Sequence, residues 1–299
     1  IYLDWEHNCL CRLITHRRVT GPSMSWSPDG SQLAFTMNVP AEAPVIAKMP
    51  KKPKGAKWAG APRITDRLYH ERDGSGYIPP GFSHIFVIPA GGGAARQVSS
   101  GDYQHRGPLS WSPDGNSIYF SANRSEDWEY DFRNSEVYAL NLADGQVKVL
   151  TDSPGPDSNP VASPDGDYIA YSGYTDKVQA HQVSELRLMR TDGTGKKVLT
   201  AALDRSVSGL TWDAKSRGVY FTYDDKGNSK IGYVSLNGDI TKLADNLGGT
   251  SIGRPYGGGS FSVSKDGALA YTFTRPEFPA DIAVVEKGAR GPKRITNRN

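Results

Sequence analysis

The sequence contains few of the features that mark several large classes of protein. Only two of its 299 residues are cysteines, too few for a disulfide framework or for a zinc site with four thiolate ligands. No apolar run approaches the roughly 18 residues of a membrane-spanning helix. The 35 basic and 32 acidic residues leave a formal net charge of +3, unlike a histone-like basic chain or an acidic disordered one. We therefore expect a globular protein with no nucleic-acid partner and no membrane partner.

The N-terminal residues carry no signal peptide, because they lack a basic start followed by an apolar stretch. The chain begins at Ile1 rather than at a methionine. We expect the natural N-terminus, with any targeting signal, to lie upstream. The compartment, cytoplasmic or periplasmic, therefore stays open.

Glycine and proline, in contrast, are abundant. The 33 glycines and 20 prolines exceed the roughly 12% that these two residues share in an average protein. Aromatic residues make up 10% of the chain. Many turns between short aromatic segments indicate an all-β protein.

An internal repeat organises the chain. The motif S-W-S-P-D-G occurs at residues 25–30 and again at residues 110–115, and weaker copies lie near residues 162, 212 and 263. The copies are about fifty residues apart, except for the first two, which are about 85 apart. A repeat of this length predicts one supersecondary unit per copy, with an insertion in the first.

Each copy predicts four antiparallel strands: one before the motif, one after it, and two more around a glycine-containing hairpin. Four such strands form a propeller blade, and we prefer this all-β propeller to an irregular sandwich. A partial blade is expected at residues 1–18. The expected full blades cover residues 20–100 with an insertion at about 39–81, 106–151, 158–200, 208–244 and 258–296.

Strand alternation predicts which loops share a face. In a blade of four antiparallel strands, the loop between the second and third strands and the end of the fourth strand point to the same side. The segment Arg63–Tyr77 of the insertion and the loop Asp127–Tyr130 are both such loops. We therefore expect them on one face, together with the C-terminal Asn299.

These two loops contain the candidate site residues. The Arg63–Tyr77 segment combines arginine, tyrosine and aspartate, the types that contact carboxylates or peptides, although they also suit a loop that satisfies itself. The second loop places carboxylates beside Trp128 and Tyr130, which suits a cationic ligand or a solvated acidic loop. The candidates for substrate gating or interdomain contact are Arg63, Tyr69, Arg72, Asp73, Tyr77, Asp127, Trp128 and Glu129.

No catalytic residue is expected in the chain as given. Residues 249–253 match the G-x-S-x-G elbow of serine hydrolases, but they lie in an inter-blade loop without the strand and helix that this elbow needs. All six histidines precede Ser251, whereas the triad of that fold needs one after it. Neither metal-ligand spacing nor a nucleotide-binding turn is present, so we expect no metal and no cofactor. The lysine-rich stretch Lys48–Lys57 is expected to be a solvated loop.

The repeats, the insertion ending R-D-G-S-G-Y and the segment D-W-E-Y at residues 127–130 resemble the propeller of the prolyl oligopeptidase family of serine peptidases, in particular its acylaminoacyl-peptidase and dipeptidyl-peptidase-like branch. The resemblance implies a propeller that gates and orients peptide substrates for a C-terminal α/β-hydrolase domain in cis. It implies a serine peptidase as the parent and an inactive chain as given. Asp127 and Glu129 are similar in placement to the paired glutamates that hold a substrate amine, although they are not consecutive.

The alternative is a stand-alone, protein-binding propeller similar to the TolB modules. Such modules are expected to have blades nearer forty residues and no long insertion. The fifty-residue period and the Arg63–Tyr77 segment favour the peptidase interpretation.

Overall fold

The computed structural model describes residues 24–42, 45, 47, 50–60, 63–249, 258–289 and 291–297. Over these ranges the chain forms strands and turns and no helix, so the all-β prediction is confirmed. In the same ranges no long apolar helix suited to crossing a membrane is found. The partial blade predicted at residues 1–18, both cysteines and Asn299 lie outside the described residues.

The first three sheets each contain four antiparallel strands from one copy of the repeat. The first sheet contains β1 (Ser25–Trp26), β2 (Gln32–Pro40), β5 (Gly81–Pro89) and β6 (Arg96–Gln97). The second contains β7 (His105–Trp111), β8 (Ser117–Ala122), β9 (Glu136–Asn141) and β10 (Val147–Val149). The third contains β11 (Asp157–Ala162), β12 (Tyr168–Gly173), β13 (Glu185–Arg190) and β14 (Lys197–Val198).

The last two copies of the repeat are joined into one eight-stranded sheet by a single pairing of Leu247 with Phe273. The fourth copy supplies β15 (Val207–Trp212), β16 (Gly218–Asp225), β17 (Asn228–Ser235) and β18 (Ile240–Leu247). The fifth supplies β19 (Phe261–Val263), β20 (Leu269–Arg275), β21 (Phe278–Val285) and β22 (Lys293–Arg294). We refer to these two halves as the fourth and fifth sheets.

The S-P-D-G turns have a shared hydrogen-bond pattern. Ser27 Oγ donates to Asp29 Oδ1 at 2.6 Å and accepts from the backbone N–H of Gln32 at 2.9 Å. Gly30 has a φ of 70°, the left-handed conformation that glycine adopts at low cost. These bonds hold the pKa of Asp29 at about 2, chiefly through the Ser27 hydroxyl. The same pair of a serine and an aspartate closes the turns at Ser112, Ser163 and Ser264.

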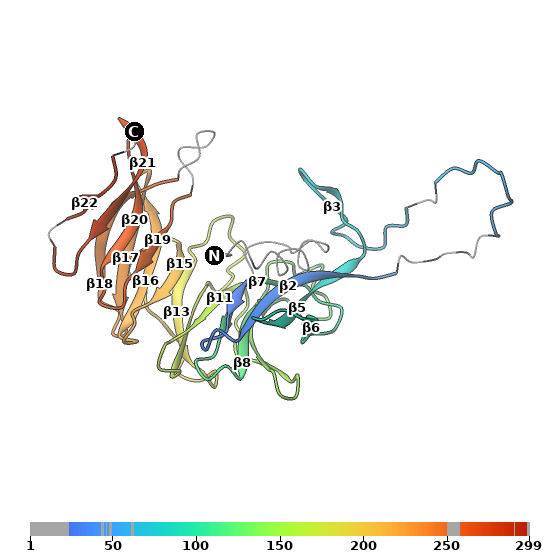
Figure 1. Cartoon of the computed structure of the whole chain (residues 1–299), viewed down its shortest axis with the longest axis horizontal. Coiled ribbons are helices and arrows are strands. Elements are labelled where there is room, and N and C mark those ends of the chain that lie inside the picture. The colour runs from blue at the N-terminus through green and yellow to red at the C-terminus, as the bar shows by residue number, and fades with distance from the viewer. Residues whose placement is uncertain are drawn as a thin grey trace.

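Successive sheets stack through the repeated motif and through apolar clusters. Trp111 Nε1 donates to the Ser25 carbonyl of the preceding sheet at 2.9 Å, and Trp212 Nε1 donates to the Val161 carbonyl at 2.8 Å. Buried side chains of each sheet pack against those of the next, as Ile85 does in a cluster with Phe120. The sheets therefore follow one another in chain order across the molecule, from the blue sheet to the red one (Figure 1). The number of blades, their boundaries and the closure of a ring stay predictions.

The connections between second and third strands differ along the chain. In the first sheet this connection is the insertion. It leaves β2 at Pro40 and returns to β5 at Gly81, and these two residues form the last pair between the strands. It contains the hairpin of β3 (Glu71–Arg72) and β4 (Gly76–Tyr77). Long loops also follow β8 and β12, whereas β16–β17 and β20–β21 are tight hairpins. The insertion lies at the end of the molecule opposite β20 to β22 (Figure 1).

Candidate functional site

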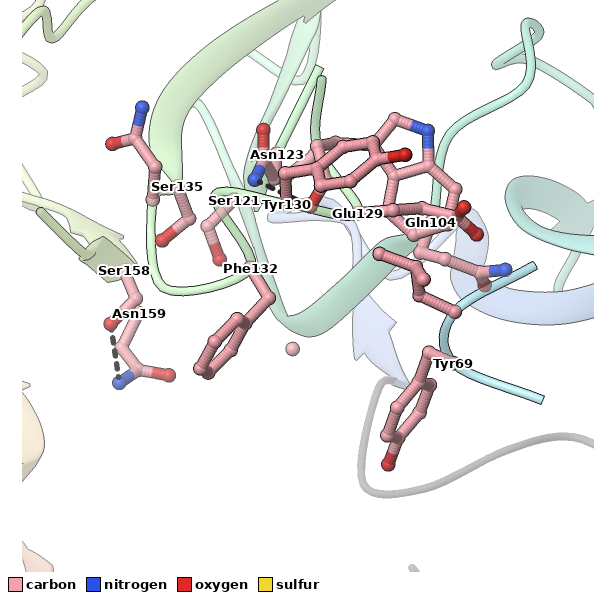
Figure 2. A pocket seen from close by; sticks show the side chains of 15 residues that line it. Tyr69, Gln104, Ser121, Asn123, Glu129, Tyr130, Phe132, Ser135, Ser158 and Asn159 are labelled. Atoms are coloured by element: carbon pink, nitrogen blue, oxygen red, sulfur yellow. Dashed lines mark hydrogen bonds between the residues drawn. The ribbon is translucent and has the colours of Figure 1, made fainter. Parts of the chain in front are cut away.

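An open pocket of about 1040 Å³ lies where the insertion meets the second and third sheets. Its residues come from three places: the insertion, the end of β8 with the loop between β8 and β9, and the first strands β7 and β11 with the segment before β7 (Figure 2). They are Leu68, Tyr69, Gln104, Gly107, Ser121, Ala122, Asn123, Trp128, Glu129, Tyr130, Phe132, Asn134, Ser135, Ser158 and Asn159.

The rim of the pocket is apolar and exposed. Tyr130 and Phe132 each expose 76% of their surface, Leu68 exposes 59% and Tyr69 exposes 51%. Figure 2 shows the rings of Phe132 and Tyr69 on either side of an open space. Monomeric proteins seldom gather large apolar side chains on one exposed patch unless the patch contacts a ligand or a partner.

The insertion is anchored at this place by polar contacts. The Gln104 side chain donates to the Gly81 carbonyl and accepts from the Ser83 N–H, both at 3.1 Å. Arg67 lies over the ring of Phe82 at 4.4 Å, a favourable cation–π arrangement. Trp128 lines both the pocket and a smaller cavity of about 40 Å³ under the insertion. The insertion and the second sheet are therefore packed together at the pocket wall.

The loop between β8 and β9 is organised around Asn123. Its Nδ2 donates to the carbonyls of Asp131 at 2.7 Å and Trp128 at 3.5 Å, and its Oδ1 accepts from Ser125 Oγ at 2.8 Å. Across the pocket edge, Arg133 pairs with Asp176 of the next loop at 3.6 Å. These bonds hold the loop in the shape that presents Phe132 to the pocket.

The polar lining is rich in hydrogen-bond acceptors. Glu129 Oε1 and Asn134 Oδ1 are buried and have no hydrogen-bond partner among the described residues. The fifteen lining residues include one carboxylate and no lysine, arginine or histidine. Because these two oxygens are closed off from the pocket, a ligand would meet the amide and hydroxyl groups of the other lining residues. A lining with one carboxylate and no cationic side chain disfavours an anionic ligand.

The structure brings together some of the predicted site residues. Tyr69, Trp128 and Glu129 line the pocket, and Tyr77 lines the small cavity with Tyr69 and Trp128. The prediction that the Arg63–Tyr77 and Asp127–Tyr130 segments share one face is therefore confirmed. Its extension to Asn299 lies outside the described residues.

Other predicted residues lie away from the pocket. Arg63 lies over the ring of Tyr77 at 5.0 Å. Arg72 and Asp73 are exposed at the β3–β4 hairpin, where Arg72 Nε donates to Tyr69 Oη at 3.3 Å. Asp127 is exposed, and its backbone carbonyl accepts from Tyr130 N–H and Asp131 N–H in a turn. These side chains shape the two segments without lining the cavity.

Several pocket residues were not predicted from the sequence. Phe132 and Asn134 follow the predicted site loop Asp127–Tyr130, and the aromatic residues of this loop are the sequence feature that points to them. No sequence pattern marks three further residues as part of a site, because they lie just before or near the start of first strands and reach the pocket only through the stacking of sheets. These residues are Gln104, Ser158 and Asn159.

A histidine pair is buried between the first and second sheets, next to the pocket. His105 is fully buried, donates from Nδ1 to the Ser83 carbonyl at 3.0 Å and accepts at Nε2 from Arg124 Nη1 at 3.1 Å. Its ring lies 5.2 Å from that of His84. Burial lowers the pKa of His105 to about 4, and the Arg124 charge acts in the same direction. His105 is therefore neutral at pH 7.

An ionic cluster is buried in the third sheet, where it acts on Glu136 of the second sheet. Arg187 contacts Asp157 at 3.5 Å and Glu185 at 3.3 Å, and its side chain is only 9% exposed. Burial raises the pKa of Asp157 to about 6, although Arg187 opposes the shift. Burial also raises the pKa of Glu136 to about 7, although Thr151 Oγ1 donates to this carboxylate at 2.5 Å. Both carboxyl groups titrate near neutral pH.

Comparison with known proteins places this site within a recognised region. Residues 65–179 match the family described as the dipeptidyl peptidase IV (DPP IV) N-terminal region. The match includes every residue that lines the pocket. The resemblance to peptidase propellers is confirmed.

The structural neighbours share a propeller-like fold with this chain. An acylaminoacyl peptidase of Pyrococcus horikoshii superposes with a TM-score of 0.62 at 16% identity, over 92% of this chain and 38% of that chain. TolB of Acinetobacter baumannii superposes with a TM-score of 0.50 at 17% identity, over 72% of this chain and 49% of its own. At these identities the likeness shows a shared fold.

A sequence relative is the uncharacterized protein Atu1656 of Agrobacterium fabrum. It is 25% identical over 163 residues, which cover 54% of this chain and 45% of that protein. The chain spans less than half of the length of each of these three relatives.

Proposed function

We propose that the chain is the non-catalytic propeller of a serine peptidase of the prolyl oligopeptidase family, and that its pocket contacts and orients peptide substrates. The observation that carries the proposal is the pocket itself. Its exposed aromatic rim and the amide and hydroxyl groups of its lining suit a peptide, which offers apolar side chains and backbone hydrogen-bonding groups. The peptidase-family match includes the whole lining.

In this proposal the hydrolytic chemistry belongs to an α/β-hydrolase domain in cis, as the family resemblance implies. Among the residues that the structure describes, the pocket lining has no histidine that would serve as the general base of a serine nucleophile. The propeller's own residues therefore bind and position the substrate. Phe132 and Tyr69 provide apolar contact, Glu129 disfavours an acidic substrate, and the insertion closes one side of the pocket.

The test is direct binding of short peptides to the chain. The probes are acetyl-Ala-Phe-Ala-amide and the matched peptide with glutamate in place of phenylalanine. We expect the phenylalanine peptide to bind more tightly and to remain intact, as followed by calorimetry and mass spectrometry. Phe132→Ala and Tyr69→Ala should each weaken binding about five-fold or more.

Val149→Ala is the matched control, because Val149 is 52% exposed on β10 and does not line the pocket. It should leave binding unchanged. The proposal is contradicted if neither peptide binds, or if the control weakens binding as much as the rim variants do.

The second candidate function is a TolB-like, protein-binding propeller without a hydrolase domain. The shared fold with TolB supports it. It predicts that folded proteins bind at the exposed rim while short peptides do not, so the same peptide titration separates the two candidates.

A further inference from the structure

The first strands of three sheets contain the same irregularity. In β7, β11 and β15 the pairing with the next strand shifts register before the tryptophan position of the repeat. Inside each shift lies one residue with a positive φ: Gly107 at 89°, Asn159 at 54° and Gly209 at 62°. Glycine is the residue expected at such a bulge, because a side chain strains the left-handed conformation. Asn159 is the one member of the three that carries a side chain.

The left-handed backbone explains the two glycines, since neighbouring atoms leave room for a Cβ. A Cβ at Gly107 would lie 3.4 Å from Ser121 Oγ, an ordinary contact, and a Cβ at Gly209 would lie 3.3 Å from Thr222 Oγ1. At residue 159 the same backbone bend is made with asparagine, which tolerates the left-handed region better than most residues but less well than glycine. The backbone alone therefore does not account for the asparagine.

The Asn159 side chain is held in one orientation at the pocket wall. Its Nδ2 donates to Ser172 Oγ at 3.0 Å and to Ser158 Oγ at 3.3 Å. Both donor contacts lie on the nitrogen, which leaves the carboxamide oxygen for another group. Figure 2 shows this oxygen turned away from Ser158, on the side of the Phe132 ring.

Asn159 lies beside an apolar surface of the same pocket. Phe132 of the loop between β8 and β9 exposes 76% of its surface, and Figure 2 shows its ring next to Asn159. A ligand at this place is favoured if it carries an N–H group for the Asn159 oxygen and an apolar side chain for Phe132. A peptide has both features.

We propose that Asn159 is a specificity residue of the pocket, whose Oδ1 accepts a hydrogen bond from a backbone N–H of the bound peptide while the peptide's apolar side chain lies against Phe132. This inference rests on the proposed peptide-orienting function of the same pocket. The ligand group that Asn159 would recognise is a main-chain N–H of the peptide.

The test combines a backbone change in the ligand with a side-chain change in the protein. The probes are acetyl-Ala-Phe-Ala-amide and three versions of it, each with one peptide nitrogen methylated. With the wild-type chain, one methylation should weaken binding about five-fold beyond the others, the usual effect of one lost hydrogen bond. Asn159→Gly should weaken binding of the parent peptide by a similar factor and should be insensitive to that methylation.

Two variants serve as controls. Asn246→Gly makes the same exchange at another left-handed asparagine, with a φ of 61° in β18 and no part in the pocket lining, and should leave binding unchanged. Asn159→Gly itself should melt close to the wild type, because the relief of left-handed strain offsets part of the two lost hydrogen bonds. A folded variant at the temperature of the titration shows that weaker binding is not a sign of unfolding.

The outcomes separate this inference from the proposed function. If Phe132→Ala weakens binding while Asn159→Gly does not, or if all methylations have the same effect in both proteins, the role of Asn159 is refuted and peptide binding stands. If the wild-type chain binds none of the peptides, the proposed function fails and the inference fails with it.

Discussion

The first three sheets and the last two are built from the same repeat but differ at their edges and interfaces. The first three have long connections between their second and third strands, and the pocket lies among these loops. The last two have tight hairpins at the same position. Their interfaces contain the apolar clusters around Phe221 and Tyr271. The interfaces of the second sheet contain apolar clusters around Phe120 and Tyr171 as well, and in addition a buried histidine pair and a buried ionic cluster.

This difference indicates how one scaffold separates support from recognition. In the fourth and fifth sheets the buried carboxylates pair within their own sheet, as Asp213 does with Arg217 and Asp281 with Arg294. In the third sheet Asp157 and Arg187 also pair within one sheet, but Asp157 acts on the buried Glu136 of the second sheet, and burial raises the pKa of both carboxyl groups. We call the first three sheets, which contain the pocket, the pocket half of the molecule. We infer that the stability of the pocket half responds to pH more than that of the fourth and fifth sheets.

The largest expected effect follows from removing Arg187. Arg187→Met leaves Asp157 buried without its cation, and breaking a buried ion pair in this way costs about 3–5 kcal/mol. The cost should be near that value at pH 8 and smaller at pH 5, where Asp157 is protonated. Urea unfolding at the two pH values measures it.

The double variant Arg187→Met with Asp157→Asn is the control, and it should recover part of the loss at pH 8. An equal loss of unfolding free energy at both pH values would show that the ionic cluster does not make the stability of the pocket half depend on pH.

His105 is expected to make the pocket half sensitive to acid. Its folded-state pKa of about 4 lies below the ordinary value of 6.5, so its contribution to stability is complete above pH 6.5 and is lost as the pH falls through 4. The linkage amounts to about 3 kcal/mol. His105→Gln should flatten the fall in unfolding free energy between pH 6.5 and 4, as measured by urea titration.

Val219→Ala tests whether that slope belongs to the first interface. Val219 is fully buried in the apolar cluster between the third and fourth sheets. The variant should be less stable at every pH with an unchanged slope, and a changed slope would contradict the assignment.

Glu136 is expected to act in the opposite direction. Its folded-state pKa of about 7 lies above the ordinary value of 4.5, so its contribution is complete below pH 4.5 and is lost as the pH rises through 7. Because this side chain is partly exposed, we expect about 2 kcal/mol. Glu136→Gln should remove this loss between pH 5 and 8, and an unchanged slope would refute the prediction.

The smallest effect is expected outside the pocket half, in the fourth sheet. Lys226 has a φ of 53° and precedes Gly227 in the β16–β17 hairpin. Asparagine suits the first position of such a turn better than lysine, so Lys226→Asn should raise the unfolding free energy by about 0.5–1 kcal/mol. Peptide binding should not change, in contrast to Asn159→Gly in the pocket half.

The candidate site could be predicted only in part. Trp128 and Glu129 were found because aromatic and acidic residues crowd one loop, and Tyr69 because it lies in an insertion that interrupts the repeat. Asn159 and Gln104 belong to segments whose sequence resembles any other start of a first strand. Arg72 is exposed at the β3–β4 hairpin and does not line the pocket, and its role in substrate gating or interdomain contact stays a prediction.

The sequence by itself determined the strands, the turns and their order. These depend on short-range patterns. A serine hydroxyl donates a hydrogen bond to the aspartate two residues later, a glycine with a positive φ follows that aspartate, and apolar residues alternate along the strands. Strand alternation also determined that the insertion and the next loop share a face. Only the tertiary structure decided which side chains meet in the pocket and which ionisable groups are buried. Burial, distances across sheets and the bend at Asn159 arise from the stacking of segments far apart in the chain, which no local pattern contains.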